Sequence, residues 1–295
     1  MTTFVELLKA ILYGIVEGIT EWLPVSSTGH LIILEDVLSF SFVEDAVFMA
    51  EFYEMFQVVI QLGAILAVVV LFWHKLWPFS RRASTHERQS TWRLWGRVLV
   101  ASIPAAVVGL GLDKLLEAQT GKDMDGWLYN SVVVAIALIV YGVAFILIEK
   151  YRKNTAPRIE RVEDITLLTA LCIGAFQALS LIPGTSRSGS TILGSMMLGL
   201  SRATAAEFSF FMAIPAMAGA SAIKALGFVK YVAETDTAVP AMAYLTLAVG
   251  CLVSFAVSLA AIRFLTDFVK RHTFSAFGIY RIVLGVLVLA WALVR

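Results

Sequence analysis

Apolar runs of membrane-spanning length recur along this 295-residue chain, separated by short charged links. Hydrophobic residues make up 59% of the chain and charged residues only 15%, a balance that excludes an ordinary soluble domain. The runs long and apolar enough for transmembrane helices cover residues 54–73, 96–112, 127–148, 204–228, 240–262 and 277–294. The sequence therefore predicts an all-α integral membrane protein with six transmembrane helices, forming one domain over residues 1–295.

Two further segments are apolar at their edges and polar at their centres. Residues 17–30 read EGITEWLPVSSTGH, and residues 177–191 read QALSLIPGTSRSGST. Each contains a proline that stops a helix, followed by hydroxyl residues that can cap the start of another. Because each piece is too short and too polar to cross the hydrocarbon core alone, we predict two re-entrant helical hairpins, at about 4–38 and 165–200.

The two polar segments align without gaps, which indicates an internal repeat. The alignment pairs glycines with glycines and polar residues with polar residues: Gly14 with Gly174, Glu17 with Gln177, Thr20 with Ser180, Ser26 with Ser186, Ser27 with Arg187, Thr28 with Ser188 and Gly29 with Gly189. Interrupted helices at matching places in two halves of a membrane protein favour a site at membrane depth.

The charges of the links predict how the chain is threaded through the membrane. Basic and acidic or weakly charged links alternate: 74–95, 150–164 and 263–275 are basic, and 39–53, 113–126 and 229–239 are not. Basic links belong in the cytoplasm, so both termini lie outside, the first hairpin enters from outside and the second from the cytoplasm. Residues 1–150 and 160–295, each with one hairpin and three spans, then form an inverted-topology repeat.

The first polar segment carries groups suited to phosphate chemistry. Glu17 and Glu21 share one helix face, and two carboxylates in apolar surroundings favour a raised pKa or a bound cation. A pair facing a water cavity or an arginine is the structural alternative. Ser26, Ser27 and Thr28 begin the next helix, where backbone N–H groups bind anions. Ordinary capping explains one serine, but not three hydroxyls followed by a histidine, His30.

The second polar segment adds a positive charge. Arg187 stands at another helix start between Ser186 and Ser188, with Thr191 one turn further on. An arginine at hydrocarbon depth needs an anionic partner, and its planar guanidinium suits phosphate. If the hairpins meet, a nucleophile, an acid or base and a charge clamp converge on one anion, the layout of phosphoryl transfer. Arg281, by contrast, is expected to extend to the membrane interface.

Residues 17–21 (EGITE), 23–30 (LPVSSTGH) and 183–191 (PGTSRSGST) resemble the two signature motifs of the bacterial undecaprenyl-diphosphate phosphatase family, of the bacitracin-resistance type. The resemblance extends over essentially the whole chain. It implies removal of the terminal phosphate from undecaprenyl diphosphate, which regenerates the lipid carrier for peptidoglycan and other cell-wall polymers. The implied setting is the bacterial inner (plasma) membrane, and the link charges predict a site open to the periplasmic or outer side.

The resemblance also implies roles for individual residues. Ser27 is the candidate nucleophile, Glu21 and His30 are the acid/base or orienting groups, and Arg187 is the phosphate clamp. Glu17 and Glu21 are candidates for a divalent cation, Mg²⁺ or Ca²⁺. The residues expected to position the diphosphate are Ser26, Thr28, Ser186, Ser188 and Thr191. A phosphoseryl intermediate and direct attack by water both stay open.

A second function fits the same pattern, because inverted repeats with broken helices also build lipid flippases and other transporters. The hydroxyl nucleophile close to a histidine favours the enzyme, since carrying an anion needs no nucleophile. The expected partners are a polyprenyl diphosphate lipid and the bilayer, with no nucleic acid. A monomer and a homodimer both fit the sequence.

Overall fold

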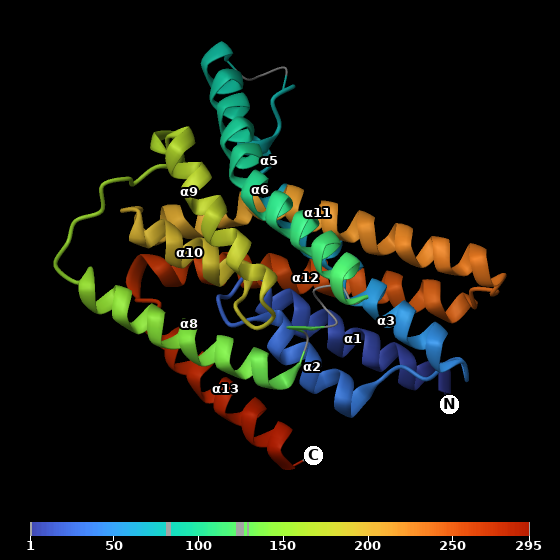
Figure 1. Cartoon of the computed structure of the whole chain (residues 1–295). Coiled ribbons are helices and arrows are strands. Elements are labelled where there is room, and N and C mark those ends of the chain that lie inside the picture. Colours follow the sequence, from blue (N-terminus) through green and yellow to red (C-terminus); the bar gives the residue numbers. More distant parts are fainter. Residues whose placement is uncertain (1, 81–83, 122–126, 129, 295) are drawn as a thin grey trace.

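The computed structural model describes residues 2–80, 84–121, 127–128 and 130–294. Regular structure in these residues is helical, apart from one isolated bridge between Ile159 and Leu200. The helices are α1 (Thr2–Thr20), α2 (Ser27–Leu38), α3 (Ala46–Val59), α4 (Gln61–Leu71), α5 (Trp73–Leu76), α6 (Thr85–Thr120), α8 (Ser131–Tyr151), η1 (Val162–Asp164), α9 (Leu167–Ala178), η2 (Leu179–Leu181), α10 (Arg187–Met197), α11 (Arg202–Thr235), α12 (Ala241–Arg271) and α13 (Ser275–Val294) (Figure 1).

Six helical stretches in this part of the chain are long and apolar enough to cross a membrane, one for each predicted span. They are Ala46–Leu71, Thr85–Thr120, Ser131–Tyr151, Arg202–Thr235, Ala241–Arg271 and Ser275–Leu293. The all-α, multi-pass membrane class is therefore confirmed. Most of these helices continue beyond their apolar runs because residues of the charged links also adopt helical structure. The predicted links at 74–95 and 113–126 include residues 81–83 and 122–126, which lie outside the described residues.

The polar segments form the predicted helix–break–helix units. Residues 21–26 separate α1 from α2, and residues 179–186, including the short η2, separate α9 from α10. The two connecting loops, blue and yellow in Figure 1, lie side by side at the centre of the molecule. Chain breaks encoded by Pro24 and Pro183 thus bring two distant helix starts to one place.

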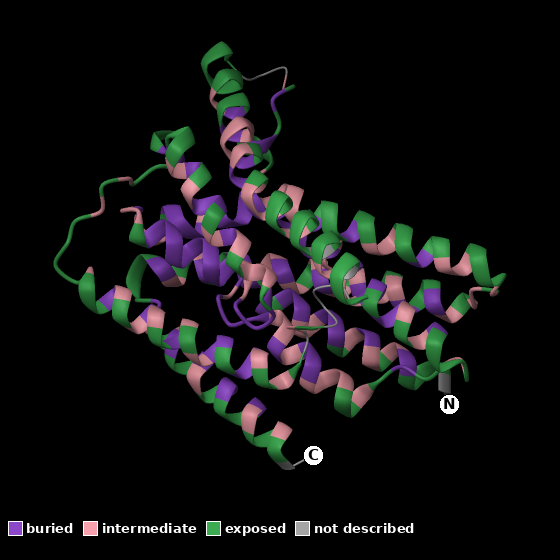
Figure 2. Ribbon diagram, viewed as in Figure 1, coloured by how far each residue is buried: buried purple, intermediate pink, exposed green. Residues whose placement is uncertain are grey.

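Burial is concentrated around these breaks. Buried residues occupy nearly the whole length of α10 and the adjoining part of α11, whereas the outer faces of the long helices are exposed (Figure 2). Those outer faces carry large apolar side chains, such as Leu147 on α8, Leu226 on α11 and Leu252 on α12. An apolar exterior around a partly polar centre is the arrangement that lipid surroundings require.

Candidate active site

Both helix starts at the centre are built in the same strained way. Ser26 has φ 74° and Ser186 has φ 69°, a left-handed conformation that is uncommon for a residue with a side chain. Each serine caps its helix: Oγ of Ser26 accepts from the Gly29 N–H at 3.4 Å, and Oγ of Ser186 from the Gly189 N–H at 3.1 Å. The next residue in each case, Ser27 or Arg187, is thereby held at a helix N-terminus.

Glu21 connects Ser27 and Arg187. The Ser27 hydroxyl donates to Oε2 of Glu21 at 2.9 Å, and Nη2 of Arg187 donates to Oε1 at 2.9 Å. The side chains of Glu21 and Arg187 are only 7% and 11% exposed. A carboxylate bonded to a serine hydroxyl is placed to take its proton, and the arginine fixes the orientation of that carboxylate.

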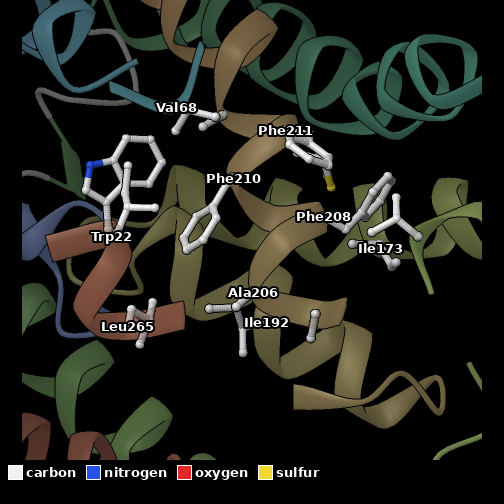
Figure 3. Close-up of a cluster of buried hydrophobic side chains, with 14 of the residues drawn as sticks. Trp22, Val68, Ile173, Ile192, Ala206, Phe208, Phe210, Phe211 and Leu265 are labelled. Atoms are coloured by element: carbon white, nitrogen blue, oxygen red, sulfur yellow. The ribbon is translucent and has the colours of Figure 1, made fainter. Parts of the chain in front are cut away.

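Arg187 is held on its other side by α11 and by an aromatic ring. Its Nη1 donates to the Ser209 carbonyl oxygen at 2.7 Å, and its guanidinium lies 5.6 Å from the centre of the Trp22 ring. Figure 3 shows Trp22 facing Phe210 within the buried apolar cluster, and their ring centres are 5.5 Å apart. Packing on both sides therefore leaves the guanidinium little freedom to swing away.

The second helix start also contacts the first directly. The Ser188 hydroxyl donates to the backbone oxygen of Glu21 at 3.0 Å and lies 3.1 Å from Oγ of Ser186. The Thr191 hydroxyl is buried, donates to the Arg187 carbonyl oxygen at 2.9 Å and pairs with Oγ of Ser209 at 2.7 Å. Three of the residues predicted to hold substrate thus form hydrogen bonds to other protein groups: Ser186, Ser188 and Thr191.

Thr28 stands on the first turn of α2, partly exposed, next to Ser27. A free hydroxyl on the first turn, beside the N–H groups of a helix start, suits the binding of an anion. Its contact with substrate stays a prediction, and its side chain forms no part of the chain of hydrogen bonds through Glu21.

Glu17, on α1 and one helical turn before Glu21, is fully buried. No donor group among the described residues bonds its carboxylate oxygens, and the side chain of Glu21 lies close enough to share a proton with it, with Arg187 also within electrostatic range. A buried carboxylate without a partner is costly unless it carries a proton or faces a cation. The described residues contain no group of three or more acidic, histidine or cysteine side chains that could bind a metal by themselves.

The side chain of His30 does not bond to Ser27, Glu21 or Arg187. Its Nδ1 lies 2.7 Å from the Ser26 carbonyl oxygen, and its Nε2 lies 2.7 Å from the hydroxyl of Tyr280 on α13. No hydrogen bond joins His30 to Ser27, whose hydroxyl is already bonded to Glu21. The site therefore consists of a Ser27–Glu21–Arg187 chain with a separate His30–Tyr280 pair beside it.

Comparison with known proteins identifies the family of the chain. The family model described as "Bacitracin resistance protein BacA" matches residues 10–287. The chain belongs to the BacA family. Proteins named undecaprenyl-diphosphatase from Enterococcus faecalis and Acetivibrio thermocellus are each 49% identical over 98% of both chains. One of the same name from Limosilactobacillus fermentum is 50% identical over 97% of both chains.

One expectation for this BacA-family chain is wrong. Arg281 does not extend to the membrane interface; it is fully buried. Its guanidinium donates to the carbonyl oxygens of Pro24 at 3.2 Å, Gly184 at 2.8 Å and Thr185 at 2.9 Å, and it lies over the Tyr141 ring. The helix breaks leave these carbonyl groups without intrahelical partners, and Arg281 supplies the missing donors.

Sequence reasoning missed three further contributors to this BacA-family site: Ser209, Trp22 and Tyr280. Ser209 and Tyr280 lie within apolar helices, where a single polar residue is common and gives no local signal. Trp22, between residues 17–21 and 23–30 of the first polar segment, is typical of an ordinary core residue. Arg281, next to Tyr280, is the one local signal for this part of the site, because an arginine with apolar sequence on both sides needs partners inside the protein.

Proposed function

We propose that this chain hydrolyses undecaprenyl diphosphate to undecaprenyl phosphate and inorganic phosphate, the activity named in its relatives. The observation that carries the proposal is the partly buried Ser27–Glu21–Arg187 chain, which combines a nucleophile, a base and a phosphate-binding cation across two helix starts. The product is the lipid carrier used for peptidoglycan and other cell-wall polymers. The relatives are named for hydrolysis and not for transport, so the flippase alternative is not favoured.

The chemistry follows from the hydrogen bonds. Glu21 accepts the Ser27 proton as Oγ attacks the terminal phosphorus, and the bond from that phosphorus to the bridging oxygen breaks. Undecaprenyl phosphate leaves, and water then hydrolyses the phosphoserine. Direct attack by water activated by Glu21 is the alternative route with the same products. Nε of Arg187 is buried without a partner among the described residues, so it is a donor that the protein itself leaves unsatisfied.

The surroundings of Glu17 fit a divalent cation. No donor bonds its two oxygens, which lie beside Glu21, and Mg²⁺ is commonly bound by one or two carboxylates together with substrate phosphates. We assign Mg²⁺ or Ca²⁺ to Glu17 and Glu21. Such an ion would neutralise charge on the diphosphate. The partly exposed Thr28 and the Ser26 and Ser186 helix starts are assigned to the diphosphate oxygens.

The inverted repeat and its hairpins are supported by the short helices of the second hairpin and by the matched glycines of both. At about 1.5 Å per residue, α9 and α10 are roughly 18 and 17 Å long, well short of a bilayer core of about 30 Å. The aligned glycines act alike: a Cβ on Gly14 would lie 2.8 Å from the Gly250 carbonyl oxygen on α12. A Cβ on Gly174 would lie 2.1 Å from the Ala101 carbonyl oxygen on α6. With basic links in the cytoplasm, the site opens to the periplasmic or outer side.

The test is phosphate release from undecaprenyl diphosphate by detergent-purified protein, with and without a chelator. We expect release that depends on the cation and is lost in Ser27→Ala and Arg187→Ala. Ser90→Ala and Arg93→Ala, outside the site, serve as matched controls. A folded wild-type protein that releases no phosphate would overturn the proposal. Release that survives Ser27→Ala would keep the enzyme but assign the attack to water.

A further inference from the structure

The two ring nitrogens of His30 have partners of different kinds. Nδ1 lies 2.7 Å from the carbonyl oxygen of Ser26, a group that can only accept a hydrogen bond. Nδ1 therefore carries the proton in the neutral ring. Nε2 then presents its lone pair, and the hydroxyl of Tyr280, 2.7 Å away, donates to it.

Tyr280 also fixes the plane of the imidazole. The two rings are nearly parallel, with centres 5.8 Å apart and planes only 8° from parallel, and the hydroxyl meets the imidazole at its edge. On the opposite edge, the carbonyl that holds Nδ1 belongs to Ser26, whose left-handed backbone also sets the position of Ser27. His30 is thus held between α13 and the same strained residue that places the nucleophile.

The residue after Tyr280 fixes α13 relative to the site. Arg281 is buried and donates to carbonyl oxygens of both connecting loops, at Pro24 and at Gly184 and Thr185. Because these bonds prevent α13 from sliding past the loops, the Tyr280 hydroxyl is kept in reach of Nε2. The exposed fraction of Tyr280 is 47%, so its hydroxyl is not needed to fill the core.

We infer that Tyr280 is a positioning residue for hydrolysis: its hydroxyl and ring hold His30 in the Nδ1–H form, with Nε2 facing Tyr280. Ser27 transfers its proton to Glu21, so His30 acts outside that step: its Nδ1–H holds the carbonyl of Ser26, the strained residue directly before the nucleophile. Tyr280 acts only through His30, by keeping the ring in the orientation that makes this bond. The kinetic part of this inference rests on the proposed function, whereas the tautomer and orientation of His30 do not.

A double-mutant cycle tests the kinetic part. Tyr280→Phe keeps the ring and removes one neutral hydrogen bond, so we expect kcat to fall about fivefold to tenfold with KM nearly unchanged. In a His30→Ala background the same substitution should have no further effect. Tyr244→Phe, an exposed tyrosine on α12, is the matched control. Effects of Tyr280→Phe and His30→Ala that multiply would overturn the inference.

Nitrogen NMR of labelled histidine tests the structural part without any activity. The chain has four histidines, so His30 is assigned by its loss in His30→Ala. We expect a protonated Nδ1 and a hydrogen-bonded Nε2 whose resonance moves in Tyr280→Phe and not in Tyr244→Phe. An unchanged Nε2 resonance would overturn the inference. A wild-type protein without phosphatase activity but with this Nε2 shift would contradict the proposed function and leave the pairing intact.

Discussion

Glu21 accepts hydrogen bonds from both Ser27 and Arg187, and a glutamine in its place keeps the shape of the side chain while removing its charge. Glu21→Gln keeps an oxygen for Arg187 but cannot take up the Ser27 proton. We expect kcat for phosphate release, measured at saturating Mg²⁺, to fall by about 10²-fold to 10⁴-fold. Exposed Glu44→Gln is the control. Activity within twofold of wild type in folded Glu21→Gln would rule out Glu21 as the base.

Arg281 makes a second prediction at the residue scale. Arg281→Leu leaves the loop carbonyl groups of Pro24, Gly184 and Thr185 without their donor, and a buried unpaired polar group costs about 1–3 kcal/mol. We expect a clearly lower thermal midpoint in detergent and loss of activity, with partial recovery in Arg281→Lys. Exposed Arg93→Leu should melt like wild type. An unchanged midpoint in Arg281→Leu would show that the loops do not depend on this residue.

Local sequence explains some site residues and not others. The caps at Ser26 and Ser186, and the meeting of Arg187 with a carboxylate, follow from helix breaks and from the cost of an unpaired charge. The partner of His30 does not, because Tyr280 lies 250 residues away and the contact depends on how α13 packs. Burial of Arg281 depends likewise on the convergence of two distant loops.

At the scale of elements, a glycine in close contact with a neighbouring helix holds α1 against α12 and α9 against α6. A Cβ on Gly174 would lie 2.1 Å from the Ala101 carbonyl oxygen, so Gly174→Ala must push α9 away from α6 and shift the start of α10. We expect a thermal midpoint several degrees lower and reduced phosphate release.

Gly96→Ala, on α6, is the matched control, since a Cβ there would meet nothing within 4 Å. In a helix this change is neutral or slightly stabilising because alanine has the higher helix propensity. If Gly174→Ala and Gly96→Ala behave alike, close packing of α9 on α6 is not what positions the second helix start.

Element boundaries show where sequence reasoning stops. The hydroxyl-rich starts of α2 and α10 lie where capping chemistry predicts them. The first span, by contrast, begins at Ala46 and not at residue 54, because residues read as an acidic link continue the helix. Charge marks the edge of the apolar layer, but backbone hydrogen bonding lets a helix run past that edge.

At the scale of the whole molecule, two interrupted segments meet although most of the chain between them forms other helices. Ser27 and Arg187 occupy equivalent positions of the two helix starts, yet their proposed roles differ: one is the nucleophile and the other supplies a charge. A repeated scaffold with different residues at matched positions yields an asymmetric site, which suits a reaction that cleaves one side of a diphosphate.

The proposed inverted arrangement predicts which links are accessible from outside the cell. Ser41, in the link after α2, should face outside, and Thr155, in the basic link after α8, should face the cytoplasm; both are exposed. After replacement of Cys172 and Cys251 by alanine, single cysteines are placed at these two positions. A membrane-impermeant thiol reagent should label Ser41→Cys in intact cells and Thr155→Cys only after permeabilisation. The opposite labelling pattern would reverse the orientation and place the opening of the site on the cytoplasmic side. Labelling of both cysteines in intact cells would contradict the six-span threading.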